Sequence, residues 1–221
     1  MRIHRVAGSD ITDPRDCSVY LLDLGELVMI DAGFGESIDL LASHIEQQGF
    51  DPHNVSTVIL THCHVDHIGG ADPFRRRFGS RLVMHELDAA IVARGDNRLT
   101  AAFCFEKVFR PFPIDVIMSG EEKRLTFANQ ELVCLHTPGH TPGSISVYAD
   151  VGEKRILFAQ DLGAPLLEAF DCDPVAWRSS AEKLLALNAD ILCDGHTGVY
   201  QPRSKVRRYI GACMAANLKG E

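Results

Sequence analysis

Residues 61–70 read THCHVDHIGG and hold three histidines and one aspartate within six positions. They directly follow residues 55–60, an apolar and β-branched stretch that is typical of a buried strand. Side chains at i and i+2 lie on the same side of an extended chain, so His62 and His64 can converge on one metal ion. The two glycines at the end of the motif are expected to let the backbone turn tightly into a following helix.

Further metal-competent side chains complete the pattern. Asp66 and His67, after the chain turns, can face a second metal next to the first. Three more polar residues follow apolar strands, as a site at one edge of a sheet requires: His140, Asp161 and His196. Five histidines and two aspartates are too many ligands for one tetrahedral ion and suit two.

The rest of the chain predicts strands in consecutive groups with helices between the groups. Strands are expected at 17–22, 26–30, 55–60, 81–85, 114–118, 124–128, 131–136, 144–149, 155–159 and 189–193. Helices are expected at 36–48, 73–78, 86–94, 174–187 and 204–218. This order favours one α+β domain over residues 1–221, with two sheets and helices outside them.

Composition narrows the class of protein. The chain has 221 residues, 46% hydrophobic and 24% charged, with 22 Lys+Arg against 30 Asp+Glu and a net charge of −8. The acidic balance argues against a nucleic-acid partner, and no apolar stretch is long enough to predict a membrane span. A polar N-terminus without a signal-peptide pattern and seven cysteines without a CxxC motif predict a cytoplasmic protein with reduced thiols.

The seven candidate ligands resemble the metallo-β-lactamase superfamily, whose pattern is H-x-H-x-D-H followed by a distant His, Asp and His. The stretch 31–33, Asp-Ala-Gly after an apolar strand, is similar to the first motif of that superfamily. The resemblance implies an αββα sandwich of two mixed β-sheets flanked by helices, with the metal site at one sheet edge. Gln160, before the aspartate of the third motif, departs from the glycine found there in many members.

The resemblance also implies a ligand set and a chemistry. His62, His64 and His140 would hold the first metal, Asp66, His67 and His196 the second, and Asp161 would bridge them. Two divalent ions, zinc in preference to iron or manganese, would generate a bridging hydroxide that attacks a carbonyl or phosphorus centre. Asp66 is the candidate catalytic residue, because it could orient the hydroxide or pass a proton to the leaving group. Asp31, with Thr61 or Thr137, is expected to fix histidine tautomers.

The leading hypothesis is a metal-dependent hydrolase of a small ester, thioester, lactone or related substrate, with a homodimer possible. The sequence ends 25 residues after His196, which predicts no C-terminal domain like that of glyoxalase II-like thioesterases. The main alternative is an iron-dependent persulfide dioxygenase, with one iron held by the equivalents of His62, His140 and Asp161. A metal-bound sensing member without turnover, or a flavodiiron enzyme whose flavin domain is absent here, are further alternatives.

Several residues near the motif have simpler interpretations. Cys63 is expected to point away from the ligands and pack in the core. The other five histidines are interpreted as non-ligands: His4, His44, His53, His85 and His136. The phenylalanines of residues 103–112 are expected either in the core or at an apolar lip beside the site.

Overall fold

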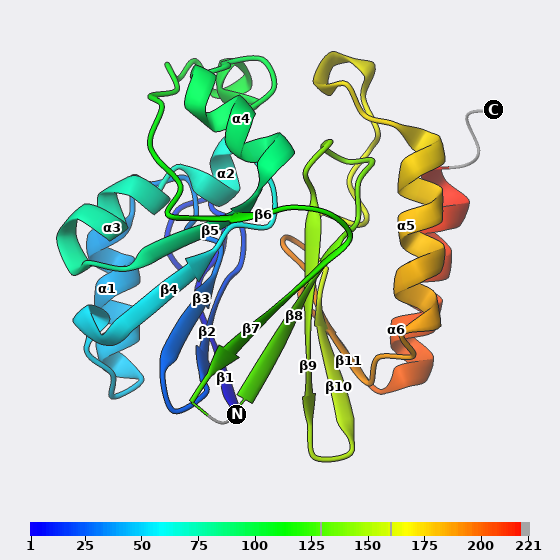
Figure 1. Ribbon diagram of the computed structural model, residues 1–221, viewed down its shortest axis with the longest axis horizontal. Coiled ribbons are helices and arrows are strands. Elements are labelled where there is room, and N and C mark those ends of the chain that lie inside the picture. The colour runs from blue at the N-terminus through cyan, green and yellow to red at the C-terminus, as the bar shows by residue number, and fades with distance from the viewer. Residues whose placement is uncertain (129, 160, 218–221) are drawn as a thin grey trace.

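The computed structural model describes residues 1–128, 130–159 and 161–217, and these form two facing β-sheets with helices on both outer faces (Figure 1). Gln160 and residues beyond Asn217 lie outside the described part. The first sheet has the order β1 (Arg2–Ala7), β2 (Val19–Asp23), β3 (Leu27–Ile30), β4 (Val55–Ile59), β5 (Arg81–His85) and β6 (Val116–Met118). The second has the order β12 (Val199–Tyr200), β11 (Ile191–Cys193), β10 (Lys154–Phe158), β9 (Ile145–Val151), β8 (Gln130–His136) and β7 (Glu122–Phe127).

Both sheets are mixed. In the first, β1, β2 and β3 pair antiparallel, whereas β3 to β6 pair parallel. In the second, β7 to β10 are antiparallel, β10 and β11 are parallel, and β11 and β12 are antiparallel. The predicted α+β sandwich of two mixed β-sheets flanked by helices is therefore confirmed.

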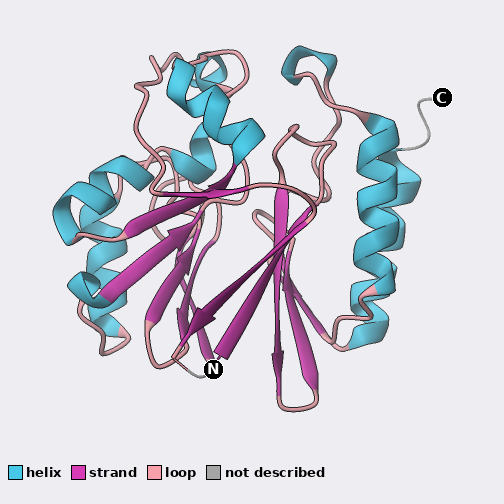
Figure 2. Cartoon of the chain, viewed as in Figure 1, coloured by secondary structure: helices cyan, strands magenta, loops and turns pink. Residues whose placement is uncertain are grey.

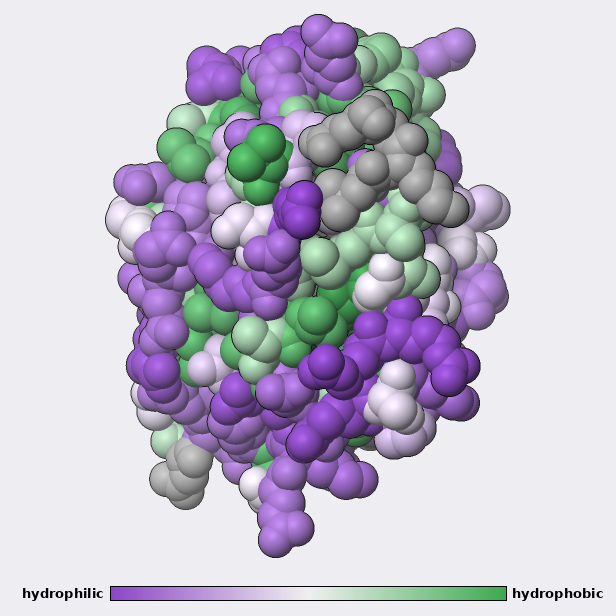
Figure 3. Space-filling view, turned by 90° about the vertical axis from the view of Figure 1, so that its right-hand side faces the viewer, coloured by the Kyte–Doolittle hydropathy of each residue, from purple (hydrophilic) through white to green (hydrophobic). Residues whose placement is uncertain are grey.

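Helices cover the two outer faces (Figure 2). On the side of the first sheet lie α1 (Ile38–Gln47), α2 (Val65–Ile68), α3 (Ala71–Phe78) and α4 (Glu86–Arg94); on the side of the second lie α5 (Pro174–Ala186) and α6 (Arg203–Asn217). Short 3₁₀ turns occur at Pro52–Asn54, Ala102–Phe105 and Glu168–Phe170. The face that α5 and α6 turn to solvent is mainly hydrophilic, with small hydrophobic areas between the polar ones (Figure 3). The helices therefore bury their apolar sides against the sheets.

The strands are apolar on both faces because both faces are buried. Tyr20 and Leu22 of β2 join the core between the sheets, whereas Val19 and Leu21 of the same strand join the core under the helices. This explains why the predicted strands read as continuous apolar runs without alternation. No helix in the described part of the chain is long and apolar enough to cross a lipid bilayer.

Most predicted elements are confirmed within a few residues, and β5 and α4 match the expected ranges. The sequence did not predict β1 and β12, which are both edge strands. The first four residues of Arg2–Ala7 are exposed or half-buried, so this segment has a polar sequence even though it pairs with β2. Edge strands need less apolar character than central ones, since only part of each is covered.

A stacked histidine pair joins the two sheets away from the metal-competent cluster. The His85 and His136 rings are parallel within 7° and 4.0 Å apart, and His85 Nδ1 accepts the backbone N–H of Leu87 at the start of α4. Burial, together with the neighbouring His136, lowers the pKa of His85 below its ordinary value of 6.5. The folded chain therefore resists protonating this ring more than the unfolded chain does.

This difference predicts a pH-dependent loss of stability. Below about pH 6.5 the unfolded chain binds a proton at His85 that the folded chain binds only at lower pH, so the unfolding free energy falls as pH falls. His85→Asn keeps a capping acceptor but does not titrate, and is expected to lose less stability than wild type between about pH 7.5 and about pH 5.5. Urea unfolding at both pH values checks this, with His53→Asn at an exposed position as control. Equal pH slopes for wild type and His85→Asn would contradict it.

Candidate metal centre

All seven candidate ligands meet at one edge of the sandwich, where the strands that precede them end. The turn after β4 and helix α2 carries four of them, and the loops after β8, β10 and β11 carry one each: His62, His64, Asp66, His67, His140, Asp161 and His196. Their ligand atoms form two groups, in each of which the atoms lie within 4.8 Å of one another. The structure therefore brings together every residue that the sequence pattern selected.

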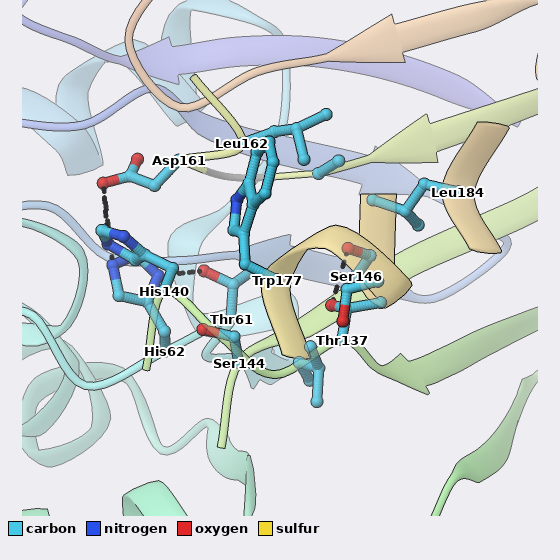
Figure 4. Close-up of a pocket in the computed structure, with 13 residues that line it drawn as sticks. Thr61, His62, Thr137, His140, Ser144, Ser146, Asp161, Leu162, Trp177 and Leu184 are labelled. Atoms are coloured by element: carbon cyan, nitrogen blue, oxygen red, sulfur yellow. Dashed lines mark hydrogen bonds and ion pairs between the residues drawn. The ribbon is translucent and has the colours of Figure 1, made fainter. Parts of the chain in front are cut away.

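The first group consists of His62, His64, His140 and Asp161, all of them buried. His140 Nε2 lies 3.0 Å from His64 Nδ1 and 3.4 Å from Asp161 Oδ2. His62 Nε2 lies 3.8 Å from the same Asp161 oxygen. Three imidazole nitrogens and one carboxylate oxygen thus lie close together. Figure 4 shows three of these residues, His62, His140 and Asp161, with their polar atoms turned toward one another.

The second group consists of Asp66, His67, His196 and again Asp161. His67 Nε2 and His196 Nε2 are 3.3 Å apart, and they lie 3.4 and 3.3 Å from Asp66 Oδ2. The same two nitrogens lie 3.2 and 3.1 Å from Asp161 Oδ1. Asp161 therefore turns one carboxylate oxygen to each group.

The donor set fits divalent metal ions. Metal–ligand bonds of about 2.1 Å at tetrahedral angles place neighbouring ligand atoms about 3.4 Å apart, close to most of the distances within both groups. His62 Nε2 is buried without a hydrogen-bond partner among the described residues. Several imidazole nitrogens and carboxylate oxygens converge without enough protons to pair them all, and a cation would satisfy the remaining lone pairs.

Electrostatics distinguish the two groups in the metal-free chain. Burial lowers the pKa of His62 and His64, that of His64 to about 3, so these two imidazoles of the first group stay neutral. Burial also opposes protonation of His196, but hydrogen bonds to Asp161 and Asp66 raise its pKa to about 10. Protonated histidine thus balances the carboxylates of the second group, as a bound cation would.

A third group, formed by Cys17, Asp31 and His67, shares its histidine with the second. Burial raises the pKa of the Cys17 thiol to about 12. The sulfur therefore stays protonated, and a thiol is a poor metal ligand. This group is better described as support for His67.

Asp31 orients the His67 ring by binding Nδ1, the nitrogen that faces away from the second group. Its Oδ2 accepts from His67 Nδ1 at 2.8 Å, and its two oxygens also accept from the backbone N–H and the hydroxyl of Thr61 at 2.8 to 3.0 Å. The Thr61 hydroxyl in turn lies 3.2 Å from His62 Nδ1. The prediction for Thr137 is wrong, because its hydroxyl pairs with Ser146 at 3.0 Å, away from the histidines (Figure 4).

Asp31→Asn is expected to weaken metal binding by roughly 10–100-fold, because the amide no longer fixes the tautomer that leaves His67 Nε2 free. Competition with a chromophoric chelator measures this affinity. Asp150→Asn, on an exposed part of β9, serves as the matched control. An unchanged metal affinity in Asp31→Asn would show that metal binding does not require the Asp31 carboxylate to orient His67.

The two glycines after the ligand-bearing helix are needed for a different reason from the one predicted. Gly69 and Gly70 have ordinary right-handed φ values of −59° and −83°. A Cβ on either would instead lie 2.1 Å from a backbone oxygen, that of Phe34 for Gly69 and that of Ala32 for Gly70. The missing side chains thus let the loop after β3, which starts with Asp31, pack directly on α2.

Sequence reasoning missed Asp88, which joins two of the ligand-bearing loops. This buried carboxylate accepts the backbone N–H of Cys63 at 2.8 Å, the hydroxyl of Thr141 at 2.7 Å and the backbone N–H of Gly143 at 2.7 Å. Cys63 lies between two candidate ligands, and its buried sulfur donates to the Leu99 carbonyl, away from the cluster as predicted. The sequence signal that could have identified it is an aspartate among the apolar, buried residues of α4.

Asp194 was also missed, and it holds the loop of His196. Its Oδ1 accepts the backbone N–H groups of His196 and Thr197, both at 2.9 Å. Its Oδ2 accepts the Tyr209 hydroxyl from α6 at 2.7 Å. The last helix thereby supports the candidate site through one side chain.

Two aromatic side chains lie beside the first group of candidate ligands. The Phe170 ring lies 5.2 Å from that of His64 and 6.0 Å from that of Phe103. Arg98 ties the two segments together, because it forms two 2.8 Å hydrogen bonds with Asp171. Of the 103–112 phenylalanines, Phe103 and Phe105 are exposed and the other two are buried, so both interpretations of that segment hold in part.

Comparisons with known proteins agree with this geometry. The model of the metallo-beta-lactamase superfamily matches residues 12–196. A probable metallo-hydrolase of Bacillus subtilis, YflN, is 28% identical over 160 residues, 65% of this chain and 60% of the relative. A hydroxyacylglutathione hydrolase of Brucella ovis is 26% identical over 184 residues, 81% of this chain and 57% of the relative. The chain therefore spans about three fifths of the length of these curated relatives.

A solved structure shows the same fold. A mutant metallo-β-lactamase of Cronobacter sakazakii superposes with a TM-score of 0.79 at 22% identity, and the match covers 97% of this chain and 89% of that one. At this identity the likeness concerns the arrangement of sheets and helices.

Proposed function

Because this chain belongs to the metallo-β-lactamase superfamily, we propose that it is a metal-dependent hydrolase of a small ester, thioester or lactone, working with two divalent metal ions. The observation that carries the proposal is the placement of Asp161. One of its oxygens faces His62 and His140, and the other faces His67 and His196. A carboxylate shared in this way suits a pair of neighbouring ions better than one ion.

Each of the two groups of candidate ligands is assigned to one of the two ions. His62, His64 and His140 would hold the first ion, Asp66, His67 and His196 would hold the second, and Asp161 would be shared between them. We infer zinc in preference to iron or manganese, since a four-coordinate set of imidazole and carboxylate ligands suits it. When bound, such ions lower the pKa of a coordinated water toward neutrality and polarise the substrate oxygen.

Asp66 is the residue proposed to handle the proton. Its side chain is 15% exposed, against 8% for Asp161, so it is the more accessible carboxylate of the cluster. From this position it orients the attacking water and passes a proton to the leaving group. Asp31 and Thr61 keep the histidines in the tautomer that leaves their metal-facing nitrogens free.

An apolar wall beside His64 favours a substrate with an apolar acyl group. Phe170 and Phe103 form this wall, and the Phe103 side chain is 51% exposed. Large apolar side chains exposed beside a polar cluster are available to contact a ligand.

Phe170→Ala is expected to reduce the preference for a hexanoyl over an acetyl ester by roughly tenfold in kcat/KM, since it removes about 1.5 kcal/mol of apolar contact. Steady-state kinetics with both esters measures the ratio. Phe105→Ala is the control, because that ring packs 5.0 Å from Phe34 and not on His64. An unchanged ratio in Phe170→Ala would place the acyl group elsewhere.

The proposal is tested by elemental analysis of protein purified without added metal, followed by a panel of substrates. The panel contains a hydroxyacylglutathione thioester, lactones, simple esters, a phosphodiester and a β-lactam. Two zinc ions per chain with turnover of an ester, thioester or lactone support the proposal. One iron per chain with oxygen uptake on glutathione persulfide overturns it in favour of a dioxygenase. Bound metal without any turnover overturns it in favour of a sensing role.

A further inference from the structure

One cavity lies apart from the metal-competent cluster and has no role in the proposed reaction. It has a volume of about 480 Å³ and lies between α2, the start of α3 and the segment 107–112. None of the seven candidate ligands lines it. Its volume falls within the roughly 300–1,000 Å³ of small-molecule sites.

The cavity shares helix α2 with the cluster but uses the other face of that helix. Val65 and Gly69, one helical turn apart, line the cavity. His67, two residues after Val65, projects from the opposite side of the same short helix, and neither it nor Asp66, which both belong to the second group, lines the cavity. A ligand in this cavity would therefore occupy a separate site.

Part of the cavity lining is apolar. Five of the lining residues have apolar side chains: Val65, Val108, Phe109, Pro111 and Phe112. Val108 is 75% exposed, although it is an aliphatic side chain at the rim of a cavity. Such a surface gains free energy when a hydrophobic body covers it.

The charges around the cavity are mainly positive, in a chain whose net charge is −8. Arg76, Lys107 and Arg110 line it, against the single carboxylate of Asp72. That carboxylate is already paired, at 2.8 Å with Arg75 and at 2.7 Å with Arg76. Arg110 is exposed and has no ion pair among the described residues.

Lys107 is held in place at the edge of the cavity. Its Nζ donates to the Phe34 carbonyl at 2.9 Å and lies 4.0 Å from the centre of the Phe34 ring. The nearest carboxylate, that of Glu36, is 3.9 Å away and is also bound by Arg15 at 2.7 Å. The ammonium group is thus positioned but only weakly neutralised.

We propose that this cavity is a binding site for a small organic anion with an apolar body. The anionic head contacts Arg110 and Lys107, and the apolar body packs on Val108, Phe109 and Phe112. Uncompensated cations beside a hollow apolar wall are the complement of such a molecule.

The test uses 8-anilinonaphthalene-1-sulfonate, whose fluorescence rises in apolar sites, titrated into the metal-loaded protein. We expect one probe per chain, and a Kd at least about tenfold higher for N-phenyl-1-naphthylamine, which has the same ring system without the sulfonate. Arg110→Glu is expected to raise the Kd of the sulfonate by a similar factor. Val108→Glu, at an exposed position that tolerates a polar side chain, is expected to act in the same direction.

Two controls make the outcome decisive. Arg208→Glu changes an exposed arginine on α6, against the second sheet, and should leave the Kd unchanged. His196→Ala alters the metal-competent cluster and should also leave it unchanged. The proposal is overturned if Arg110→Glu matches Arg208→Glu, if the neutral probe binds as well as the anion, or if His196→Ala abolishes binding and so places the probe at the cluster.

Discussion

Asp161→Asn is expected to reduce the metal content from the two ions proposed per chain to one or none, and to lower kcat/KM by more than the roughly 10–100-fold that follows loss of a supporting residue. The reason is the division of the carboxylate between the two groups, with Oδ2 toward His140 and Oδ1 toward His67 and His196. An asparagine keeps one oxygen, but its amide nitrogen has no lone pair for a metal. One group therefore loses a ligand outright.

This substitution removes one carboxylate oxygen without changing the backbone conformation at position 161. Asp161 has a left-handed φ of 56°, a conformation that asparagine tolerates as well as aspartate does. Elemental analysis and kinetics on the best substrate of the panel measure the two effects, with Asp150→Asn as the surface control. Two ions and wild-type kcat/KM in Asp161→Asn would rule out the shared carboxylate as the basis of the site.

Asp88→Ala is expected to destabilise the chain by about 2–6 kcal/mol and to make it lose metal faster. The truncation leaves the buried backbone N–H groups of Cys63 and Gly143 without an acceptor, at about 1–3 kcal/mol each. The hydroxyl of Thr141 can turn to Ser144, 2.7 Å away, so it adds less. Metal loss follows because the two amides belong to the loops that carry His62, His64 and His140.

Urea unfolding and the rate of metal transfer to a chelator measure both effects. Asp88→Asn should lie between wild type and Asp88→Ala, because its one oxygen still accepts while its amide nitrogen meets a donor. Glu86→Ala, on an exposed position of the same helix, controls for changes to α4 itself. If the unfolding free energy of Asp88→Ala equals that of Glu86→Ala, the Asp88 carboxylate does not stabilise the two ligand-bearing loops.

The sequence predicted the fold well where one local signal sufficed. The strands β2 to β5 and β8 to β11 are apolar because both of their faces are buried, and this signal survives in any short window of sequence. Asp173 directly precedes α5 and is a typical N-cap residue, and its side chain accepts from the first backbone N–H groups of that helix. Arg2–Ala7 was missed because an edge strand with half-buried polar residues has no such signal.

The candidate ligands were also identified from local pattern alone. Spacing of two residues in an extended segment places His62 and His64 on one side, and polar residues just past apolar strands must lie at the edge where those strands end. These are properties of consecutive residues. The convergence of the ligands also requires that β8, β10 and β11 run in the same direction, which the pairing of the second sheet provides.

Only the tertiary structure decided which groups support the ligands. Asp88 contacts residues 25 and 53 positions away, and Thr137 turns to Ser146 although its place in the sequence suited a histidine partner. The need for glycine at 69 and 70 likewise comes from the chain at 32–34, which packs against them. Such contacts depend on how loops from both sheets meet. Short-range spacing therefore carries the ligand set, whereas the hydrogen bonds that orient it, and the separate cationic cavity behind α2, arise only when the loops pack together.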